Sequence, residues 1–147
     1  MRRYDVFILL AARFDEAFVI ACFIQLRLVG LRAGLVGLTA AFVQGCYGLN
    51  LCPDLTLSEL IAQEQVAEAG FILPGTSDCL TMLFAEPRVI ELIAKRLSVQ
   101  AKAALLTIYP ALTLLRDAGI AAKPRQVLVV EQWSELEEQI GRFVGSA

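Results

Sequence analysis

Histidine is absent from this 147-residue sequence, and its absence removes several kinds of active site at once. Without it there is no Ser-His-Asp triad, no Cys-His dyad and no His-containing zinc site. The four cysteines, Cys22, Cys46, Cys52 and Cys79, lack the paired spacing of a metal site. We therefore expect neither a metal nor a cofactor. Cys46 and Cys52 could in principle form a disulfide, but reduced thiols are the expectation for an intracellular protein.

Positive charge is also scarce and nowhere concentrated. The sequence has 13 Lys and Arg against 15 Asp and Glu, for a net charge of −2. Because phosphate binding needs clustered basic residues, we expect no nucleic-acid partner. The length of 147 residues predicts a single domain, residues 1–147. Hydrophobic residues make up 57% of the chain, which suits a parallel sheet covered on both faces and also a chain that buries further surface in an oligomer.

No apolar run is long enough to predict a membrane span. The run from Ala17 to Ile24 ends at Gln25, well short of the ~20 residues that a spanning helix needs. The basic start at Arg2 superficially resembles a signal peptide, but Asp15 and Glu16 stand where small residues should mark a cleavage site. We expect a cytoplasmic protein that does not enter the membrane.

Strand-like and helix-like segments alternate along the chain. Buried apolar runs predict strands at residues 4–11, 35–39, 69–73, 103–107 and 126–130. Periodicity and capping residues predict helices at 15–29, 56–64, 77–100 with a break near Pro87, 110–119 and 134–144, and a hairpin-like excursion at 45–54. This alternation predicts an α/β fold with a single doubly wound, mainly parallel sheet and helices on both faces.

Three segments that are distant in sequence should meet at one edge of that sheet. In doubly wound folds, sites form beyond the carboxyl ends of the strands, here at residues 13–16, 74–79 and 107–110. The third segment is an apolar strand that runs into a proline-started helix, as in a nucleophile elbow, with Thr107 at the exposed position. A threonine hydroxyl needs a base, and a β-branched side chain is disfavoured at the positive φ of a strained elbow. We therefore expect a relaxed turn.

At these residues the chain resembles the ThiJ/PfpI family, whose members are relatives of class I glutamine amidotransferases. Residues 7–16 (FILLAARFDE) resemble the family's opening strand and acid, and 52–59 (CPDLTLSE) its proline-aspartate stretch. Residues 72–76 (ILPGT) resemble its Leu-Pro-Gly-Gly turn, and 103–110 (AALLTIYP) its elbow. The resemblance runs from residue 4 to about residue 120 and implies a flavodoxin-like fold.

The departures from the family pattern carry the functional prediction. Thr107 replaces the family's nucleophilic cysteine, Tyr109 replaces its glycine, and Thr76 replaces the second glycine of the turn. The part of the chain after the elbow helix is also shorter than is usual in the family. We expect a catalytically degenerate domain that acts by ligand binding or self-association. Its vestigial pocket would comprise Asp15, Glu16, Gly75, Thr76, Thr107, Ile108 and Tyr109.

Several of these residues have a second interpretation. Asp15 and Glu16 are either a retained pocket acid, for which Asp15 is the better positional match, or a complement to a helix dipole. The amides at Gly75 and Thr76 either form an anion or oxyanion site, or the turn is an ordinary helix start capped by Thr76 or Ser77.

An active enzyme with another nucleophile is the main alternative. Cys79 falls in the first turn of a predicted helix, where a thiolate is stabilised, and could serve a hydrolase, glyoxalase or deglycase. A buried structural cysteine is the competing interpretation. A receiver or flavodoxin-type module is disfavoured, because Leu73-Pro74-Gly75 stands where a receiver needs aspartate and residues 13–16 do not form a phosphate loop.

The helix from Ala17 to Ile24 is apolar around its whole circumference. A helix on one face of a sheet needs only one apolar stripe, so the excess predicts burial against another subunit. Homodimers are also what the family resemblance implies, and we expect one here through this helix. Tyr47 and Trp133 could line a ligand pocket, although partial burial is the ordinary expectation for lone aromatic residues.

Overall fold

The computed structural model describes residues 4–63, 69–99 and 103–146. Its strands are β1 (Val6–Leu10), β2 (Ala33–Gly37), β3 (Val43–Gln44), β4 (Asn50–Leu51), β5 (Leu55–Thr56), β6 (Gly70–Ile72), β7 (Leu105–Ile108) and β8 (Val127–Val130). Its helices are α1 (Glu16–Leu28), α2 (Leu57–Ile61), α3 (Ser77–Phe84), α4 (Pro87–Ser98), α5 (Pro110–Asp117) and α6 (Leu136–Ser146), the last preceded by the 3-10 turn η2 (Trp133–Glu135).

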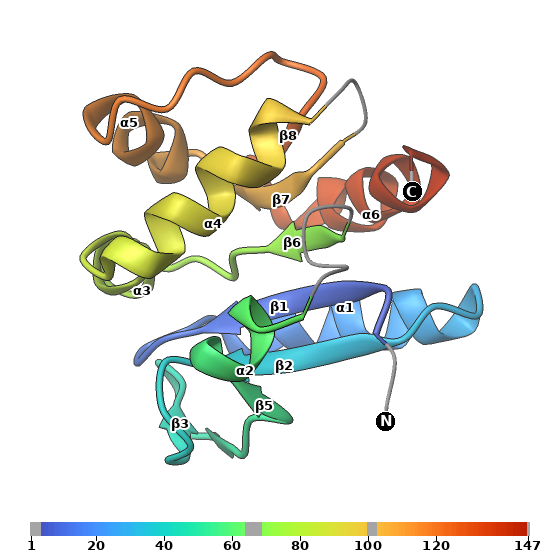
Figure 1. The fold of residues 1–147 in the computed structure, drawn as a ribbon. Coiled ribbons are helices and arrows are strands. Elements are labelled where there is room, and N and C mark those ends of the chain that lie inside the picture. The colour runs from blue at the N-terminus through green and yellow to red at the C-terminus, as the bar shows by residue number, and fades with distance from the viewer. Residues whose placement is uncertain (1–3, 64–68, 100–102, 147) are drawn as a thin grey trace.

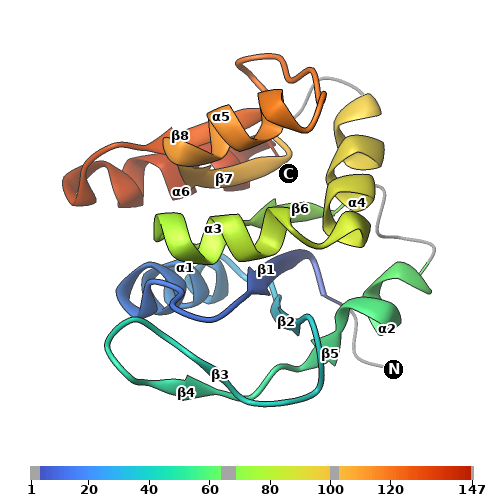
Figure 2. The ribbon, with the colours of Figure 1, turned by 90° about the vertical axis from the view of Figure 1, so that its left-hand side faces the viewer.

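The central sheet has the order β5-β2-β1-β6-β7-β8, and every pair of neighbours in it is parallel. Helices α1 and α6 lie side by side on one face, and α3, α4 and α5 cover the other (Figure 1). Strands β3 and β4 form a separate antiparallel hairpin, which projects beside β5 (Figure 2). The predicted doubly wound α/β fold is confirmed.

Strand β1 lies near the middle of this sheet and is buried along its whole length. All five of its residues pair with β2, the first three also pair with β6, and helices cover both faces, so no alternation of polar and apolar residues is needed. Helix α6 buries Leu136, Ile140 and Phe143, which recur at helical spacing, against one face of the sheet. Among the described residues, no helix is both long enough and apolar enough to cross a membrane.

Most element positions follow the sequence pattern, and the differences are local. The predicted helix over 77–100 is divided at Pro87 into α3 and α4, as expected from a proline that begins a helix. Strand β5 was not predicted, because a two-residue strand has no periodicity to detect; it forms where Leu55 pairs with Val36 of β2. Residues 64 and 100, at the ends of two predicted helices, lie outside the described residues.

The outer edge of the sheet at β8 is covered by side chains from the segment that follows it. The side-chain amide of Gln139 donates a hydrogen bond to the Val129 carbonyl at 3.1 Å. The carboxylate of Glu135 accepts one from the Glu131 N–H at 3.3 Å. These two contacts engage backbone groups at the edge that a neighbouring strand would otherwise use.

Candidate functional site at the carboxyl edge of the sheet

The three predicted segments do meet at the carboxyl ends of β1, β6 and β7. The Thr76 hydroxyl donates a hydrogen bond to the Arg13 carbonyl at 2.7 Å, and the Asp15 N–H donates to the Gly75 carbonyl at 3.2 Å. The Thr107 hydroxyl donates to the Leu73 carbonyl at 3.1 Å. One continuous network of backbone contacts therefore joins residues that lie up to 63 positions apart.

Thr107 itself is not an exposed elbow residue. It is fully buried within β7, where it pairs with Val129, and its only side-chain donor is used by the Leu73 carbonyl. The chain turns two residues later at Tyr109, whose φ of −51° and ψ of −43° are ordinary helical values. The expectation that Thr107 stands exposed above the sheet was wrong, because its β-branched side chain stays in regular strand geometry.

The space beside the turn is filled by Ile108. A Cβ atom added at Gly75 would overlap the Ile108 side chain, so glycine at this position permits the close approach of β7 to the turn after β6. Tyr109, the next residue along the chain, is 60% exposed. The oxyanion-type site predicted as one interpretation of the Gly75–Thr76 turn is thus packed against an apolar side chain.

Thr76 has the capping role that the alternative interpretation gave it. Its hydroxyl oxygen accepts a hydrogen bond from the Cys79 N–H at 3.3 Å and so caps α3. The same hydroxyl donates to the Arg13 carbonyl, which links the start of α3 to the exit of β1. Among the described residues, Arg13 is the only non-glycine residue with positive φ, at 68°.

The two acids have separate roles, and the hydrogen bonds of neither lead to Thr107. Asp15 caps α1, because its carboxylate accepts a hydrogen bond from the Phe18 N–H at 3.1 Å. Glu16 is buried, and its carboxylate accepts from the Tyr47 N–H at 2.8 Å and the Leu49 N–H at 3.1 Å. The Cys46 thiol donates to the same carboxylate at 3.3 Å.

Glu16 therefore fastens the tip of the β3–β4 hairpin to the first turn of α1. Desolvation opposes its ionisation, but hydrogen bonds from Leu49, its own amide, Cys46 and Tyr47 together hold its pKa below the ordinary value of 4.5. Gly45 makes room for this contact, since a Cβ there would overlap the carboxylate. No local pattern signals this pairing, because the partners lie about thirty residues apart in the chain.

The thiols at this edge are not activated. Cys79 is fully buried, and burial raises its pKa to about 11 despite a backbone hydrogen bond with Ala11. Cys46 is exposed, but partial desolvation and the neighbouring Glu16 carboxylate raise its pKa as well. Cys22, away from this edge, lies in the core, where burial raises its pKa to about 12. A thiolate nucleophile is disfavoured at all three positions.

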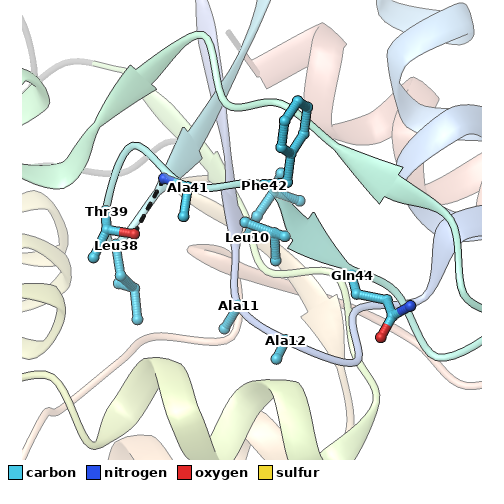
Figure 3. A pocket seen from close by; sticks show the side chains of 9 residues that line it. Leu10, Ala11, Ala12, Leu38, Thr39, Ala41, Phe42 and Gln44 are labelled. Atoms are coloured by element: carbon cyan, nitrogen blue, oxygen red, sulfur yellow. Dashed lines mark hydrogen bonds between the residues drawn. The ribbon is translucent and has the colours of Figure 1, made fainter.

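Three hollows open at this edge. The first, of about 330 Å³, lies at the ends of β1 and β2 and is lined by small and apolar side chains, among them Leu10, Ala11 and Phe42 (Figure 3). The second, of about 500 Å³, is lined by residues 12–13 and the hairpin tip at 44–48. The third, of about 610 Å³, is lined by residues 108–110, Val130 and Glu131. Thr107 lines none of the three.

Neither a metal site nor the predicted burial of two aromatic residues is found here. No cluster of three or more acidic or cysteine ligands occurs in residues 4–63, 69–99 and 103–146. Tyr47 and Trp133 are 85% and 59% exposed, which is more than the partial burial expected of them. The carboxyl edge thus offers three hollows and a set of hydrogen bonds, and the one thiol among the described residues that lines a hollow is that of Cys46, whose pKa is raised.

Known proteins resemble this chain in structure but share little of its sequence. No protein-family model matches the chain, and no curated protein does. By architecture it is a doubly wound α/β protein whose candidate site lies at the carboxyl edge of a parallel sheet. More specifically, it has the fold of the DJ-1/ThiJ/PfpI superfamily, as its solved structural neighbours show.

Three of these neighbours illustrate the likeness. A mutant of Schizosaccharomyces pombe DJ-1 aligns with a TM-score of 0.80 at 11% identity, over 97% of this chain and 91% of its own. Drosophila melanogaster DJ-1beta aligns with a TM-score of 0.79 at 16% identity, over 95% and 87%. A mutant DJ-1 superfamily protein from Salmonella typhimurium aligns with a TM-score of 0.68 at 21% identity, over 88% and 75%.

Proposed function

We propose that this DJ-1/ThiJ/PfpI-fold domain is catalytically degenerate and acts by binding a small molecule and by self-association. The observation that carries the proposal is the state of Thr107, which is buried in a regular strand with its hydroxyl donated to the Leu73 carbonyl. A hydroxyl nucleophile needs exposure to substrate and a base within hydrogen-bonding reach. Thr107 has neither in this arrangement.

The outer face of α1 supports self-association. Ile20, Phe23, Ile24 and Leu28 are 44%, 43%, 50% and 73% exposed, and their spacing places them on one stripe of the helix. The opposite face, with Val19, Cys22 and Leu26, is buried on the sheet. We call the four exposed residues the α1 stripe. Contiguous apolar surface of this kind marks interaction sites, and a second copy of the chain is the partner we propose.

The proposal also includes a cytoplasmic location and a hollow for the small-molecule ligand. All four cysteines are free, which supports the predicted cytoplasmic location, since thiols stay reduced there. A small-molecule ligand would enter the apolar hollow of about 330 Å³ at the ends of β1 and β2, a volume within the usual range of ligand pockets.

The test of degeneracy is an assay of purified protein for glyoxalase, deglycase and peptidase turnover. We expect no turnover above the uncatalysed rate, and no difference between the protein and its Thr107→Ala variant. Robust turnover that is lost in Thr107→Ala would overturn the proposal. Light scattering across a range of concentrations tests self-association, for which we expect the mass of a dimer.

An enzyme that uses Cys79 is the alternative, and thiol labelling separates it from the proposal. With a pKa raised to about 11, Cys79 should react with iodoacetamide far more slowly at pH 7 than an ordinary thiol. Exposed Cys52 provides an internal comparison in the same protein. Rapid labelling of Cys79 together with loss of a measured activity would favour the enzyme.

A further inference from the structure

A second kind of site lies at the opposite, amino edge of the sheet, beyond the end of α1. There a hollow of about 360 Å³ is lined by Tyr4, Phe23, Arg27, Leu31, Arg32 and Asp54, together with Ala33. Its volume falls within the range of small-molecule pockets. It shares only Phe23 with the α1 stripe and has no residue in common with the three hollows at the carboxyl edge.

The backbone around the two arginines is held firmly. Gly30, with φ of 83°, ends α1 in the left-handed conformation, and the Leu31 N–H donates to the Leu26 carbonyl at 2.9 Å. The Arg32 N–H donates to the Asp5 carboxylate at 2.8 Å, and the Arg32 carbonyl accepts from the Asp5 N–H at 2.9 Å. Arg27 and Arg32 are therefore presented to one hollow by a fixed turn, while both side chains remain exposed.

The charge of this hollow is positive. Two guanidiniums face it against one carboxylate, and Asp54 already accepts a hydrogen bond from the Leu35 N–H at 2.8 Å. Within the described part of the chain, neither Arg27 nor Arg32 forms an ion pair. Guanidiniums without ion-pair partners are suited by charge and by their donors to a carboxylate or phosphate group.

The remaining walls are apolar. The Tyr4 ring lies over Gly34, where a Cβ would come within 2.8 Å of its Cγ atom, and it meets the Phe7 ring edge-on at a centroid distance of 5.9 Å. Leu31 packs against the core, and Phe23 closes the side toward α1. An inorganic anion would leave these walls exposed to water, whereas an apolar group attached to the anion would cover them.

We propose that this hollow binds a small organic anion, a carboxylate or phosphate ester carried on an apolar body about the size of a benzene ring. The guanidiniums of Arg27 and Arg32 hold the anionic group, and the side chains of Tyr4, Phe23 and Leu31 cover the apolar body. No group is transferred and no bond is broken. This site is independent of the proposed degeneracy at Thr107.

Amide chemical shifts in an NMR titration of the whole chain test the proposal, with phenyl phosphate and benzoate as probes. For at least one probe we expect saturable shifts at Leu31, Arg32 and Ala33, with a dissociation constant on the order of 1 mM, as suits a ligand of this size. Phenol and inorganic phosphate each lack one half of the recognised chemistry, so both should bind more weakly. Whichever of phenyl phosphate and benzoate binds with the lower dissociation constant indicates whether the site prefers a phosphate ester or a carboxylate.

Variants assign the binding to the arginines. We expect Arg27→Gln and Arg32→Gln each to weaken binding about tenfold, the loss of one charge-assisted hydrogen bond. Arg116→Gln, at an exposed arginine in the last turn of α5, is the matched control and should bind as the parent does. These variants retain Ile20, Ile24 and Leu28, so light scattering reports separately on the α1 stripe.

Three results would overturn the proposal. One is the absence of shifts at Leu31, Arg32 and Ala33 with both probes at about ten times the expected dissociation constant. Another is equal affinity for inorganic phosphate and phenyl phosphate. The third is an equal loss of binding in Arg116→Gln and the two pocket variants, which would indicate general charge attraction.

Discussion

The carboxyl end of β7 is closely packed, whereas the outer face of α1 leaves apolar side chains exposed. At β7 the Thr107 hydroxyl has a partner, Ile108 fills the space over Gly75, and the turn has ordinary backbone angles. On α1 the stripe of apolar side chains is left exposed. One region of the fold is thus closed by side-chain packing, while another leaves apolar side chains open to solvent. Variants in each region test the comparison.

The largest loss of stability is expected from Gly75→Ala. The added methyl group would overlap Ile108, and such overpacking costs about 1–3 kcal/mol in free energy of unfolding. Ile108→Ala in the same chain should remove most of that cost, which urea denaturation of the four proteins of a double-mutant cycle would measure. Gly141→Ala in α6 is the control, since nothing lies within 4 Å of the new methyl group there. Equal costs of Gly75→Ala with and without Ile108 would contradict the packing described.

Glu16→Gln should lower the free energy of unfolding by about 1–3 kcal/mol, because two hairpin amides, those of Tyr47 and Leu49, lose a charged acceptor. The pKa of Glu16 is lowered in the folded protein, so its contribution is present above the ordinary pKa of 4.5 and is lost as pH falls through the folded value. The stability difference between parent and variant should therefore shrink in acid. Glu138→Gln, at an exposed ion pair with Arg142, should change stability by less than about 0.5 kcal/mol. A difference that is constant from pH 3 to pH 7 would refute the role of the Glu16 charge.

Thr107→Val should lower the free energy of unfolding by about 1 kcal/mol. The side chain keeps its shape, but the Leu73 carbonyl loses its hydrogen-bond donor. Thr107→Ser, which keeps the hydroxyl, serves as the control for the hydrogen bond. Thr107→Cys should not create turnover, since a thiol at this buried position is neither exposed nor easily ionised. Glyoxalase, deglycase or peptidase activity in Thr107→Cys would show that the turn opens to substrate after all.

The smallest effect on the folded chain is expected from Ile24→Lys on the α1 stripe. The side chain is half exposed, so the monomer's free energy of unfolding should change by no more than about 0.5 kcal/mol. Self-association, measured by light scattering, should nevertheless weaken at least about tenfold, because a charge would be placed in an apolar interface. Leu112→Lys on α5 offers the control on the other face of the sheet. An unchanged association constant in Ile24→Lys would remove α1 from the proposed interface.

The sequence pattern predicted most of the fold but only part of the candidate site. The apolar run of β1 and the break at Pro87 are local signals, and both elements formed where they were predicted. The convergence of the three loops followed from topology alone. By contrast, the contact of Glu16 with the hairpin depends on the path of a loop thirty residues away. The burial of Thr107 depends on how many residues β7 contains. No local sequence pattern encodes the path of the loop or the end of the strand.

The cover on the outer edge of β8 has a consequence for how copies of this chain can meet. Gln139 and Glu135 occupy backbone groups that a strand from another molecule would need. Pairing of two sheets edge to edge at β8 would require both hydrogen bonds to break first. Continuous addition of copies through this edge is therefore disfavoured. The association proposed through α1 would end after two copies, because a twofold pairing uses the same surface of each. The side chains of Gln139 and Glu135 thus protect this edge of the sheet from growth into a fibre.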